Sequence, residues 1–311
     1  MTWSADFLSR NRAERVLLAE WTTFRLGGPA ELVHLDARDD LAEALAQPRR
    51  WLGRGANLLV GDAGVGEPVL RLGRAFAALE RAVTRDGRAI VRAGAAVDLA
   101  VLIRTCTEAG LAGPEGLSGV PATVGGALRM NAGTSTCWLL DWVARVEVVL
   151  PGETAPRWLE RSEMPAAYRS SGLPEGTVFL GCELELAHDD PEHLRARGAS
   201  LKRAKAASQP LALPSAGCVF KNPARDLPAG KLIDELGLKG TSIGGARVSP
   251  VHANFIVNDR GATTAEVCQL IQLVRRRAWD ARGVVLDMEV ETWNCPAELK
   301  AHPRDLKGVA A

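Results

Sequence analysis

Apolar and polar residues repeat at two different periods along the chain, and the period separates predicted helices from predicted strands. Within residues 97–108, Leu99, Leu102, Ile103 and Cys106 recur at helical spacing, which predicts an amphipathic helix. Short apolar runs bounded by turn residues predict strands. These predicted strands cover 31–35, 51–52, 58–60, 89–91, 146–150, 178–186 and 284–290.

Three further helices are predicted. A short amphipathic helix is expected over 39–46, and a basic one over 201–207. The sequence Thr263-Thr264-Ala265-Glu266 matches a capping box, in which the Thr263 hydroxyl accepts from the Glu266 amide while the Glu266 carboxylate reaches back. The helix that this box starts is expected to run to about residue 281.

The segment 116–133 interrupts this pattern. It contains five glycines and Pro121, a density that disfavours both helix and strand. The apolar residues Val120, Val124 and Leu128 argue against disorder. We therefore expect an ordered loop whose backbone wraps a ligand.

A second glycine-rich sequence, Gly53-Arg54-Gly55-Ala56-Asn57, lies between two predicted strands. Taken alone it favours a plain turn, and the alternative is a loop that points its backbone amides at a phosphate. Leu58 occupies the place of the third glycine in the Gly-x-Gly-x-x-Gly fingerprint. A Rossmann dinucleotide site is therefore not predicted.

Length and charge limit the classes of protein that fit. A chain of 311 residues accommodates two or three domains, and the polar sequence 188–193 suggests a boundary near 190–200. Lys and Arg number 38 against 37 Asp and Glu, so no overall field favours nucleic acid or an anionic membrane. No apolar run reaches the roughly 18 residues that span a bilayer, and the start lacks a signal-peptide pattern. We expect a cytoplasmic protein that has no membrane insertion and does not require an oligomer.

The candidate metal ligands are scattered. The six cysteines include no Cys-x-x-Cys pair, so reduced thiols are expected and neither a zinc knuckle nor a dithiol motif is predicted. His188 and His193, with acidic residues between them, are interpreted as a solvated linker, and no second histidine sits at ligand spacing from His252. No metal is predicted.

Several segments together resemble the UDP-N-acetylenolpyruvoylglucosamine reductase, or MurB, family, in order and in approximate spacing from Thr22 to Glu291. The segments that carry the resemblance are 22–30, 52–59, 119–133, 168–169, 216–223, 229–234, 248–258 and 286–290. Tyr168 is the chain's only tyrosine, so the resemblance is to the shorter subtype without the extra tyrosine-bearing loop.

The resemblance implies an α+β fold. An FAD-binding domain of the vanillyl-alcohol-oxidase type would occupy 1–195, in two α+β subdomains of about 1–80 and 81–195. A smaller α+β substrate-binding domain would follow over 196–311. The implied reaction takes hydride from NADPH onto FAD and then reduces the enolpyruvyl group of the sugar nucleotide, giving UDP-N-acetylmuramate for peptidoglycan.

The resemblance also assigns residues to the flavin. Arg54 and Ala56 stand where the family commonly has a small residue and a serine, and Ala122 where it commonly has glycine. Backbone amides or Arg54 could offset the lost hydroxyl, which is worth on the order of 1 kcal/mol. The implied FAD contacts are Gly53, Arg54, Gly55, Ala56, Asn57, Leu58, Gly119, Pro121, Ala122, Thr123, Gly125, Gly126 and Asn131.

Three residues match the family's catalytic positions. Arg169 would hold the substrate carboxylate, because a guanidinium grips it with two parallel hydrogen bonds. Cys218 stands where the family usually has its proton-donating serine, and a thiol of pKa about 8.5 is mostly protonated at neutral pH. Glu289 would orient or stabilise the enol intermediate. The spacing alone does not choose among Asp287, Glu289 and Glu291, which share one face of the predicted strand.

Four residues are implied as substrate contacts, namely Tyr168, Lys221, Asn222 and His252. Two alternatives stay open. The chain could be a flavin oxidase of the same fold that acts on another substrate. It could also be a flavin or sugar-nucleotide binding protein without catalysis, which the departures at Cys218 and Ala122 suggest and the presence of Arg169 and Glu289 argues against.

Overall fold

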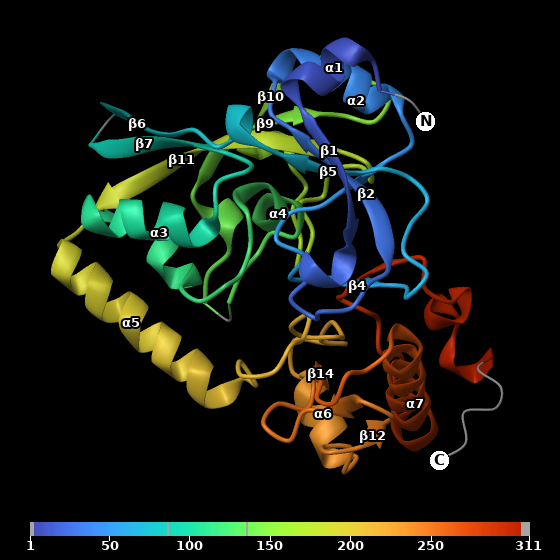
Figure 1. Ribbon diagram of the computed structural model, residues 1–311. Coiled ribbons are helices and arrows are strands. Elements are labelled where there is room, and N and C mark those ends of the chain that lie inside the picture. Colours follow the sequence, from blue (N-terminus) through green and yellow to red (C-terminus); the bar gives the residue numbers. More distant parts are fainter. Residues whose placement is uncertain (1–2, 86, 135, 306–311) are drawn as a thin grey trace. The chain divides into compact units, whose positions relative to one another are not determined.

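The computed structural model describes residues 3–85, 87–134 and 136–305 (Figure 1). The chain forms two compact units, of which unit 1 comprises 1–14, 31–54 and 67–205, and unit 2 comprises 15–30, 55–66 and 206–311. These units differ from the expected ranges 1–195 and 196–311. The N-terminal segment 55–66 belongs to unit 2 because its strand pairs with a strand near the C-terminus, as described below.

The first sheet of unit 1 has the strand order β1 (Arg12–Leu17), β2 (Pro29–Leu35), β5 (Val69–Leu72) and β3 (Arg50–Trp51). Strands β2 and β3 both pair with β5 in parallel. Helices α1 (Ala5–Arg10) and α2 (Leu41–Ala46) lie side by side in Figure 1. Their buried residues Phe7, Leu41 and Ala44 share an apolar core with Val33 and Leu70. The predicted strand 31–35 and helix 39–46 are confirmed.

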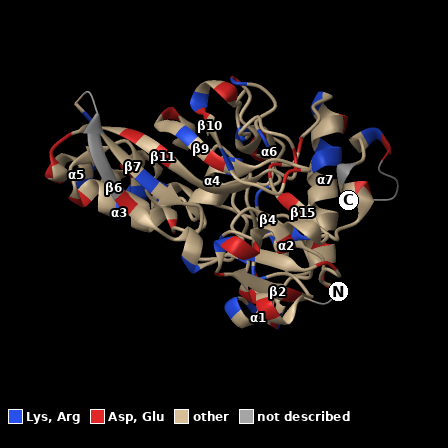
Figure 2. Cartoon of the chain, turned by 90° about the horizontal axis from the view of Figure 1, so that it is seen from above, with Lys and Arg blue, Asp and Glu red and all other residues tan. Residues whose placement is uncertain are grey.

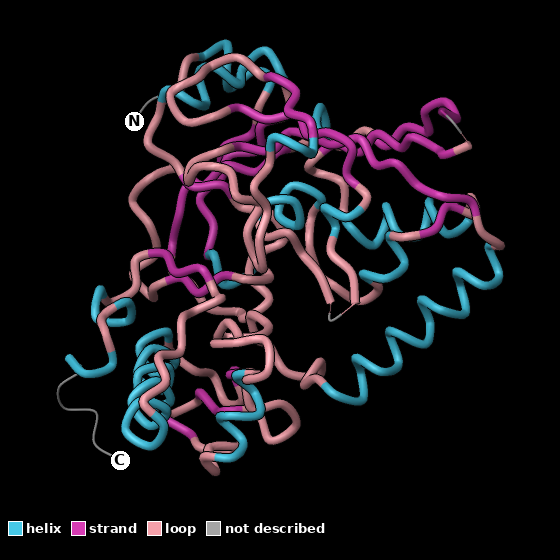
Figure 3. The backbone as a smooth tube through the Cα atoms, turned by 180° about the vertical axis from the view of Figure 1, so that it is seen from behind, coloured by secondary structure: helices cyan, strands magenta, loops and turns pink. Residues whose placement is uncertain are grey.

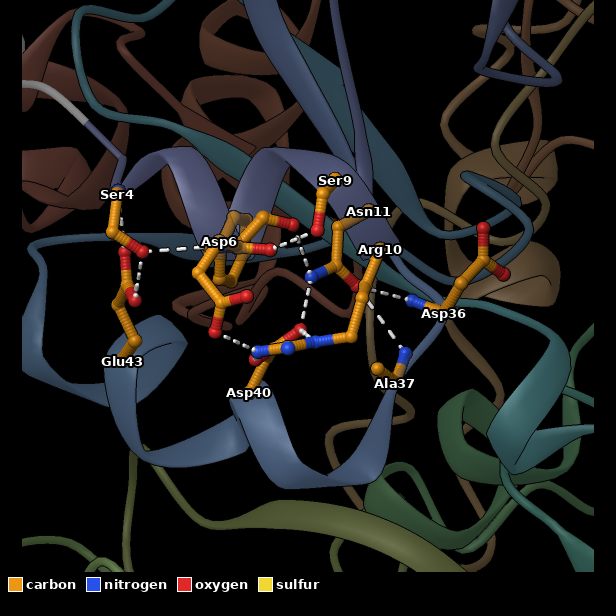
Figure 4. Close-up of polar contacts among 10 residues, drawn as sticks. Ser4, Asp6, Ser9, Arg10, Asn11, Asp36, Ala37, Asp40 and Glu43 are labelled. Carbon is orange, nitrogen blue, oxygen red and sulfur yellow. Dashed lines mark hydrogen bonds and ion pairs between the residues drawn. The ribbon is translucent and has the colours of Figure 1, made fainter.

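A buried polar cluster connects α1 to the turn before α2 (Figure 4). Asp40 is 4% exposed and accepts hydrogen bonds from Arg10 Nε at 3.0 Å and from Asn11 Nδ2 at 2.5 Å. The Arg10 hydrogen bond holds the pKa of Asp40 below its usual value. Asn11 Oδ1 also accepts from the Asp36 amide at 2.7 Å. The N-terminal helix is therefore held by polar as well as apolar contacts.

The second sheet of unit 1 has the order β10 (Arg157–Glu160), β9 (Val143–Val149), β11 (Val178–His188), β7 (Arg88–Gly94) and β6 (Leu79–Arg85), with antiparallel neighbours throughout. A short strand β8 (Leu111–Ala112) also pairs with β11. Helix α3 (Leu99–Glu108) buries Leu99, Leu102, Ile103 and Cys106 in the core of this sheet. The predicted helix and the strands near 89–91, 146–150 and 178–186 are confirmed.

The glycine-rich segment corrects one expectation. Glycine density was expected to exclude regular structure from 116–133, yet a helix α4 (Val124–Arg129) lies within it (Figure 3). The Thr123 hydroxyl caps this helix by accepting from the Gly126 amide at 3.2 Å. Val124, Ala127 and Leu128 are buried on one face. Capping and burial together overcome the low helix propensity of Gly125 and Gly126.

Helix α5 (Pro191–Ser208) begins directly after β11 and contains the predicted basic helix 201–207 as its last part. The interpretation of 188–193 as a linker is wrong, because α5 starts within it and includes the exposed His193. The boundary expected at 190–200 falls inside this helix.

Unit 2 contains an antiparallel sheet of β12 (Ser242–Ile243), β13 (Ala246–Val248) and β14 (Ile256–Asn258). Helices α6 (Ala229–Glu235) and α7 (Thr264–Arg282) contribute buried residues to the same core. The capping box is confirmed, since Thr263 Oγ1 accepts from Glu266 N at 3.2 Å and Glu266 Oε2 accepts from Thr263 N at 2.9 Å. Both bonds fix where α7 starts.

The last predicted strand is wrong in its position. The final strand is β15 (Glu291–Trp293), which pairs in parallel with β4 (Leu58–Val60), and residues 284–290 form no regular strand. Within them, Met288 makes an isolated bridge to Phe220. Leu286 and Val290 of the apolar alternation are buried in the apolar core of unit 2 although they belong to no strand.

Charge and metal ligands are distributed rather than clustered. Figure 2 shows basic and acidic residues interspersed over the described part of the chain. Among the described residues, no helix combines the length and apolar character needed to cross a membrane. In the same part of the chain, no group of three or more His, Cys, Asp or Glu residues is arranged to hold a metal ion.

Candidate active site

The predicted flavin residues of unit 1 come from two loops that touch. A Cβ atom added to Gly53 would lie 2.9 Å from Thr123 Oγ1, and one added to Gly125 would lie 2.9 Å from the Ala95 side chain. Gly119 has a φ of +81°, a conformation that glycine adopts without strain. A side chain at Gly53 or Gly125 would therefore collide with a neighbouring residue, and one at Gly119 would strain the backbone.

This arrangement fits the diphosphate part of a dinucleotide. The amides of Gly125 and Gly126 already donate to Ala95 O at 2.9 Å and to Thr123 Oγ1 at 3.2 Å, which leaves the Thr123 hydroxyl as a donor for a phosphate. Gly126 has open space beyond a 3.4 Å contact with Thr123 Oγ1. Arg54 is exposed, and its Nη1 forms an ion pair with Asp98 Oδ2 at 2.5 Å. The cation of Arg54 is thus shared with Asp98, which weakens its capacity to replace a missing hydroxyl.

Asn131 links the end of the glycine-rich segment to the predicted catalytic arginine. It has a φ of 40°, is 8% exposed, and donates from Nδ2 to the Ala167 carbonyl at 3.3 Å. Its Oδ1 accepts from the Leu140 amide at 3.3 Å. The backbone amide of Ser171 donates to Arg129 O at 3.1 Å. The sequence gives no indication of this connection, because the two segments are about 36 positions apart.

Tyr168 and Arg169 form the tip of a tight turn closed by two hydrogen bonds between Ala167 and Ser170, of 3.0 and 3.1 Å. Arg169 has a φ of 58°, in the left-handed region, and its Nη1 donates to Gly133 O at 3.1 Å. Its guanidinium carbon lies 5.3 Å from the Tyr168 ring centroid. Tyr168 is 44% exposed. A strained backbone that presents an arginine is typical of functional turns.

The remaining predicted flavin residues, Gly55 to Leu58, belong to unit 2. Gly55 has a φ of +64°, and a Cβ atom there would lie 2.1 Å from the Trp21 carbonyl. Asn57 donates from Nδ2 to the Glu289 carbonyl at 3.0 Å, and its own carbonyl accepts from Glu291 N at 3.0 Å. Leu58 is buried in β4. The loop thereby contacts the segment that carries the predicted catalytic glutamate.

Cys218 and Glu289 lie on neighbouring backbone segments of unit 2. Glu289 N donates to Val219 O at 2.8 Å, one residue after Cys218. Cys218 is half-buried and makes an isolated bridge with Phe255. Gly217, just before it, has a φ of +79°. The segment therefore runs between two others, and Cys218 stands at its start.

Burial distinguishes the three acidic candidates. Asp287 and Glu291 are exposed, whereas Glu289 is half-buried. The backbone carbonyl of Asp287 accepts a hydrogen bond from Lys221 N at 2.8 Å, so this contact does not involve the Asp287 carboxylate. Glu289 is therefore the least exposed of the three acidic residues that spacing alone could not separate.

Two of the predicted substrate residues of unit 2, Lys221 and Asn222, continue the segment that Cys218 begins. Lys221 is half-buried, and exposed Asn222 accepts from Ala229 N at 3.0 Å through Oδ1, at the start of α6. His252 stacks edge-on with Phe255 at 4.9 Å between ring centroids. Burial lowers the pKa of His252, which keeps the ring neutral near pH 7. Unit 1 holds Tyr168 and Arg169, so the predicted site residues come from both units.

Two polar residues in these segments were missed by the sequence analysis. Asn254 is 3% exposed and forms hydrogen bonds with Phe220, and Arg275 is 4% exposed and donates from Nε to Leu286 O at 3.0 Å. Both are polar residues within apolar patterns, in 251–257 and in α7. A polar residue at a core position was the available signal.

Comparisons with known families agree with this geometry. Residues 209–293 match the family described as UDP-N-acetylenolpyruvoylglucosamine reductase, C-terminal domain. Residues 29–156 match the family described as FAD binding domain. The matched ranges contain Cys218 and Glu289 in the first case, and the touching glycine loops in the second.

Individual proteins match over nearly the whole chain. UDP-N-acetylenolpyruvoylglucosamine reductase of Deinococcus radiodurans is 42% identical over 91% of this chain and 96% of its own length. The Thermus thermophilus protein of the same name is 42% identical over 91% of this chain and 99% of its own. The crystal structure of MurB from Thermus caldophilus has a TM-score of 0.79 and 40% identity, covering 91% of this chain and 99% of that one.

The expected α+β fold with an FAD-binding domain is confirmed by these matches and by the structure. FAD is the cofactor, in agreement with the glycine cradle described above. The expected place in peptidoglycan precursor synthesis follows from the same relatives. The chain belongs to the UDP-N-acetylenolpyruvoylglucosamine reductase family and is an FAD-dependent oxidoreductase.

Proposed function

We propose that the chain uses NADPH to reduce UDP-N-acetylenolpyruvoylglucosamine to UDP-N-acetylmuramate. In this proposal the catalytic residues are Arg169, Cys218 and Glu289, and the reaction takes place in the cytoplasm. The observation that carries the proposal is the hydrogen bond from Glu289 N to Val219 O, 2.8 Å long, which holds the glutamate segment against the cysteine segment. Both segments lie in the range that matches the reductase C-terminal domain. FAD held by the glycine-rich loops would supply the hydride chemistry that links NADPH to the enolpyruvyl alkene.

Arg169 binds the substrate carboxylate. Hydride addition at the methylene carbon places negative charge on the carbon next to this carboxylate, so a fixed cation stabilises the charge as it develops. A guanidinium cannot lose its charge at neutral pH. The closed turn and the Gly133 hydrogen bond hold the side chain in place before substrate binds.

Cys218 delivers the proton. Its Sγ–H gives the proton to the carbon that bears the carboxylate, a new C–H bond forms, and the thiolate that is left takes a proton from water. A thiol with an ordinary pKa of about 8.5 is a stronger acid than the hydroxyl that the family usually has here. Cys218 is half-buried, so part of the residue is exposed.

Glu289 orients the intermediate. Its partial burial sets it apart from Asp287 and Glu291, which face solvent. The Asn57 amide and the Val219 carbonyl hold its backbone from two directions. Near this segment, Lys221, Asn222 and His252 would contact the sugar nucleotide, while Tyr168 would line the pocket beside Arg169.

Anaerobic mixing tests the reaction in two halves. NADPH should bleach the flavin, and the enolpyruvyl sugar nucleotide should restore its colour. Cys218→Ala should keep the first half-reaction and slow the second by about 10²–10⁴-fold, the usual contribution of a positioned acid. Cys295→Ala, at another half-buried cysteine, is the matched control.

The alternatives give different results. Fast reoxidation of the flavin by air, without the sugar nucleotide, would support an oxidase. Flavin that binds but is never reduced by NADPH would support a non-catalytic binding protein. Parent rates for both half-reactions in Cys218→Ala would show that the proton comes from another group.

A further inference from the structure

We propose that Asn254 is a positioning residue, which acts through hydrogen bonds to Val219 and Phe220 to hold the Cys218 thiol where it can transfer its proton. This inference rests on the proposed role of Cys218 and adds to it a residue outside the matched catalytic set. Asn254 does not need to touch substrate or flavin for this role. Asn254 fixes the backbone of the residues that follow Cys218, and that backbone in turn fixes the thiol.

Asn254 makes three hydrogen bonds to two consecutive residues. Its Nδ2 donates to Phe220 O at 2.8 Å, its Oδ1 accepts from Phe220 N at 2.9 Å, and its carbonyl accepts from Val219 N at 2.8 Å. Asn254 is 3% exposed and Phe220 is 1% exposed. These bonds are therefore shielded from water, and each is costly to leave unmade.

An asparagine suits this position because its side-chain amide has the same donor and acceptor as a peptide group. It completes both backbone hydrogen bonds of Phe220, as a residue of a neighbouring strand would. From the other side, Glu289 N donates to Val219 O and Lys221 N donates to Asp287 O, both at 2.8 Å. The segment that follows Cys218 is thus held from two sides.

The hydrogen bonds to Val219 and Phe220 also restrain the position of the neighbouring Cys218 thiol. Cys218 is bonded to Val219 and forms a bridge with Phe255, the residue after Asn254. Gly217 on its other side has a φ of +79° and open space around its Cβ position, so little packing restrains the chain there. A misplacement of about 1 Å in a reacting group can cost about 10²-fold in rate. Asn254 supplies restraint where Gly217 does not.

Asn254 is itself held in place. Its backbone amide donates to His252 Nδ1 at 3.2 Å. Ser249, which is fully buried, accepts from His252 N at 3.3 Å through Oγ and donates its own amide to Phe255 O at 2.8 Å. A rigid turn therefore presents the asparagine to Phe220, which is what a positioning role requires.

Two substitutions separate position from folding. Asn254→Ala removes both side-chain bonds. Asn254→Asp is nearly isosteric, keeps an acceptor for Phe220 N and loses the donor to Phe220 O, so it preserves most of the packing if the alanine variant fails to fold. Asn258→Ala is the matched control, because Asn258 lies in the same stretch and bonds to Phe24 O at 3.4 Å and Ala262 N at 2.8 Å instead.

The first readout is the alkylation rate of Cys218 by iodoacetamide, followed by peptide mass spectrometry, with Cys295 as internal reference. Asn254→Asp should change the Cys218 rate by about fivefold or more, and Asn258→Ala should not. The second readout is the pair of half-reactions in the flavin-loaded protein. Asn254→Asp should slow reoxidation by the sugar nucleotide by about 10–100-fold and leave reduction by NADPH within about twofold.

A double variant completes the test. Adding Asn254→Asp to Cys218→Ala should slow reoxidation no further, because the asparagine acts through the cysteine. The proposal is overturned if folded Asn254→Asp keeps the parent alkylation rate, or if the two substitutions slow reoxidation independently. Failure of the proton-donor assignment looks different, since Cys218→Ala would then keep the parent rate while Asn254→Asp still altered alkylation.

Discussion

The side-chain amide of Asn57 donates a hydrogen bond to the backbone carbonyl of Glu289 across 3.0 Å. The carbonyl of Asn57 also accepts from Glu291 N at 3.0 Å, so the asparagine holds the backbone at both residue 289 and residue 291. A residue predicted to contact the flavin therefore has a second, structural partner. The glycine-rich loop and the predicted catalytic glutamate are physically linked within unit 2.

Replacing Asn57 by alanine should destabilise the protein even without flavin. One lost hydrogen bond at a half-buried site is worth about 1 kcal/mol. Urea unfolding of the apoprotein measures it, because a residue that contacted only FAD would leave the apoprotein unchanged. Parent stability of the Asn57→Ala apoprotein would argue against the structural role.

Arg169→Gly should separate stability from activity. Glycine relieves the left-handed backbone at φ 58°, worth about 1 kcal/mol, and at the same time removes the guanidinium. We expect equal or higher apoprotein stability with kcat/KM lowered roughly 30-fold to several-thousand-fold, which corresponds to the loss of about 2–5 kcal/mol when one partner of a buried charge pair is removed.

Arg25→Gly is the control for backbone relief, since Arg25 is exposed and has a φ of 54°. Thermal unfolding of the two apoproteins and steady-state kinetics of the Arg169 variant provide the measurements. Unchanged kcat/KM in Arg169→Gly would exclude the arginine from substrate binding.

Gly126→Ala should stabilise the apoprotein and weaken FAD binding. Alanine exceeds glycine in helix propensity by about 0.5–1 kcal/mol, and its Cβ would make only an ordinary 3.4 Å contact with Thr123 Oγ1. The methyl group would project into the predicted flavin cradle. Flavin titration by fluorescence should show weaker binding, whereas Gly66→Ala, in open space, should bind FAD as the parent does. Unchanged affinity in Gly126→Ala would place the flavin elsewhere.

The Asp40 cluster should make stability depend on acid pH. Arg10 holds the folded-state pKa of Asp40 below its unfolded value of about 3.9. The stabilisation is therefore complete above that unfolded value and is lost as pH falls through the folded-state pKa, because the unfolded chain then binds more protons.

Arg10→Gln should move this loss to higher pH, because it removes the hydrogen bond that lowers the pKa of Asp40. Thermal unfolding between pH 7 and pH 3 measures the shift. Arg88→Gln, in an exposed pair with Glu185, is the control and should leave the profile unchanged. Coincident profiles for the parent and Arg10→Gln would contradict the assignment.

Several elements were predicted correctly because the interactions that form them lie between residues close together in the sequence. Helix α3 follows from apolar residues at helical spacing, and the start of α7 follows from the Thr263–Glu266 box. The alternation over 284–290 misled for the opposite reason. Alternation indicates that one face is buried, and here Leu286 and Val290 are buried in the apolar core of unit 2, while the backbone makes an isolated bridge at Met288 instead of joining a sheet.

The sequence by itself predicted that a glycine-rich backbone approaches a ligand, and family resemblance predicted that this ligand is FAD. The tertiary structure decided which acidic residue of 287–291 is half-buried, that Asn131 joins Ala167, and that Asn57 and Asn254 hold the segments of Glu289 and Cys218. These contacts connect positions up to 232 residues apart. Spacing describes neighbours along one element, whereas hydrogen bonds between distant segments depend on how the whole chain packs.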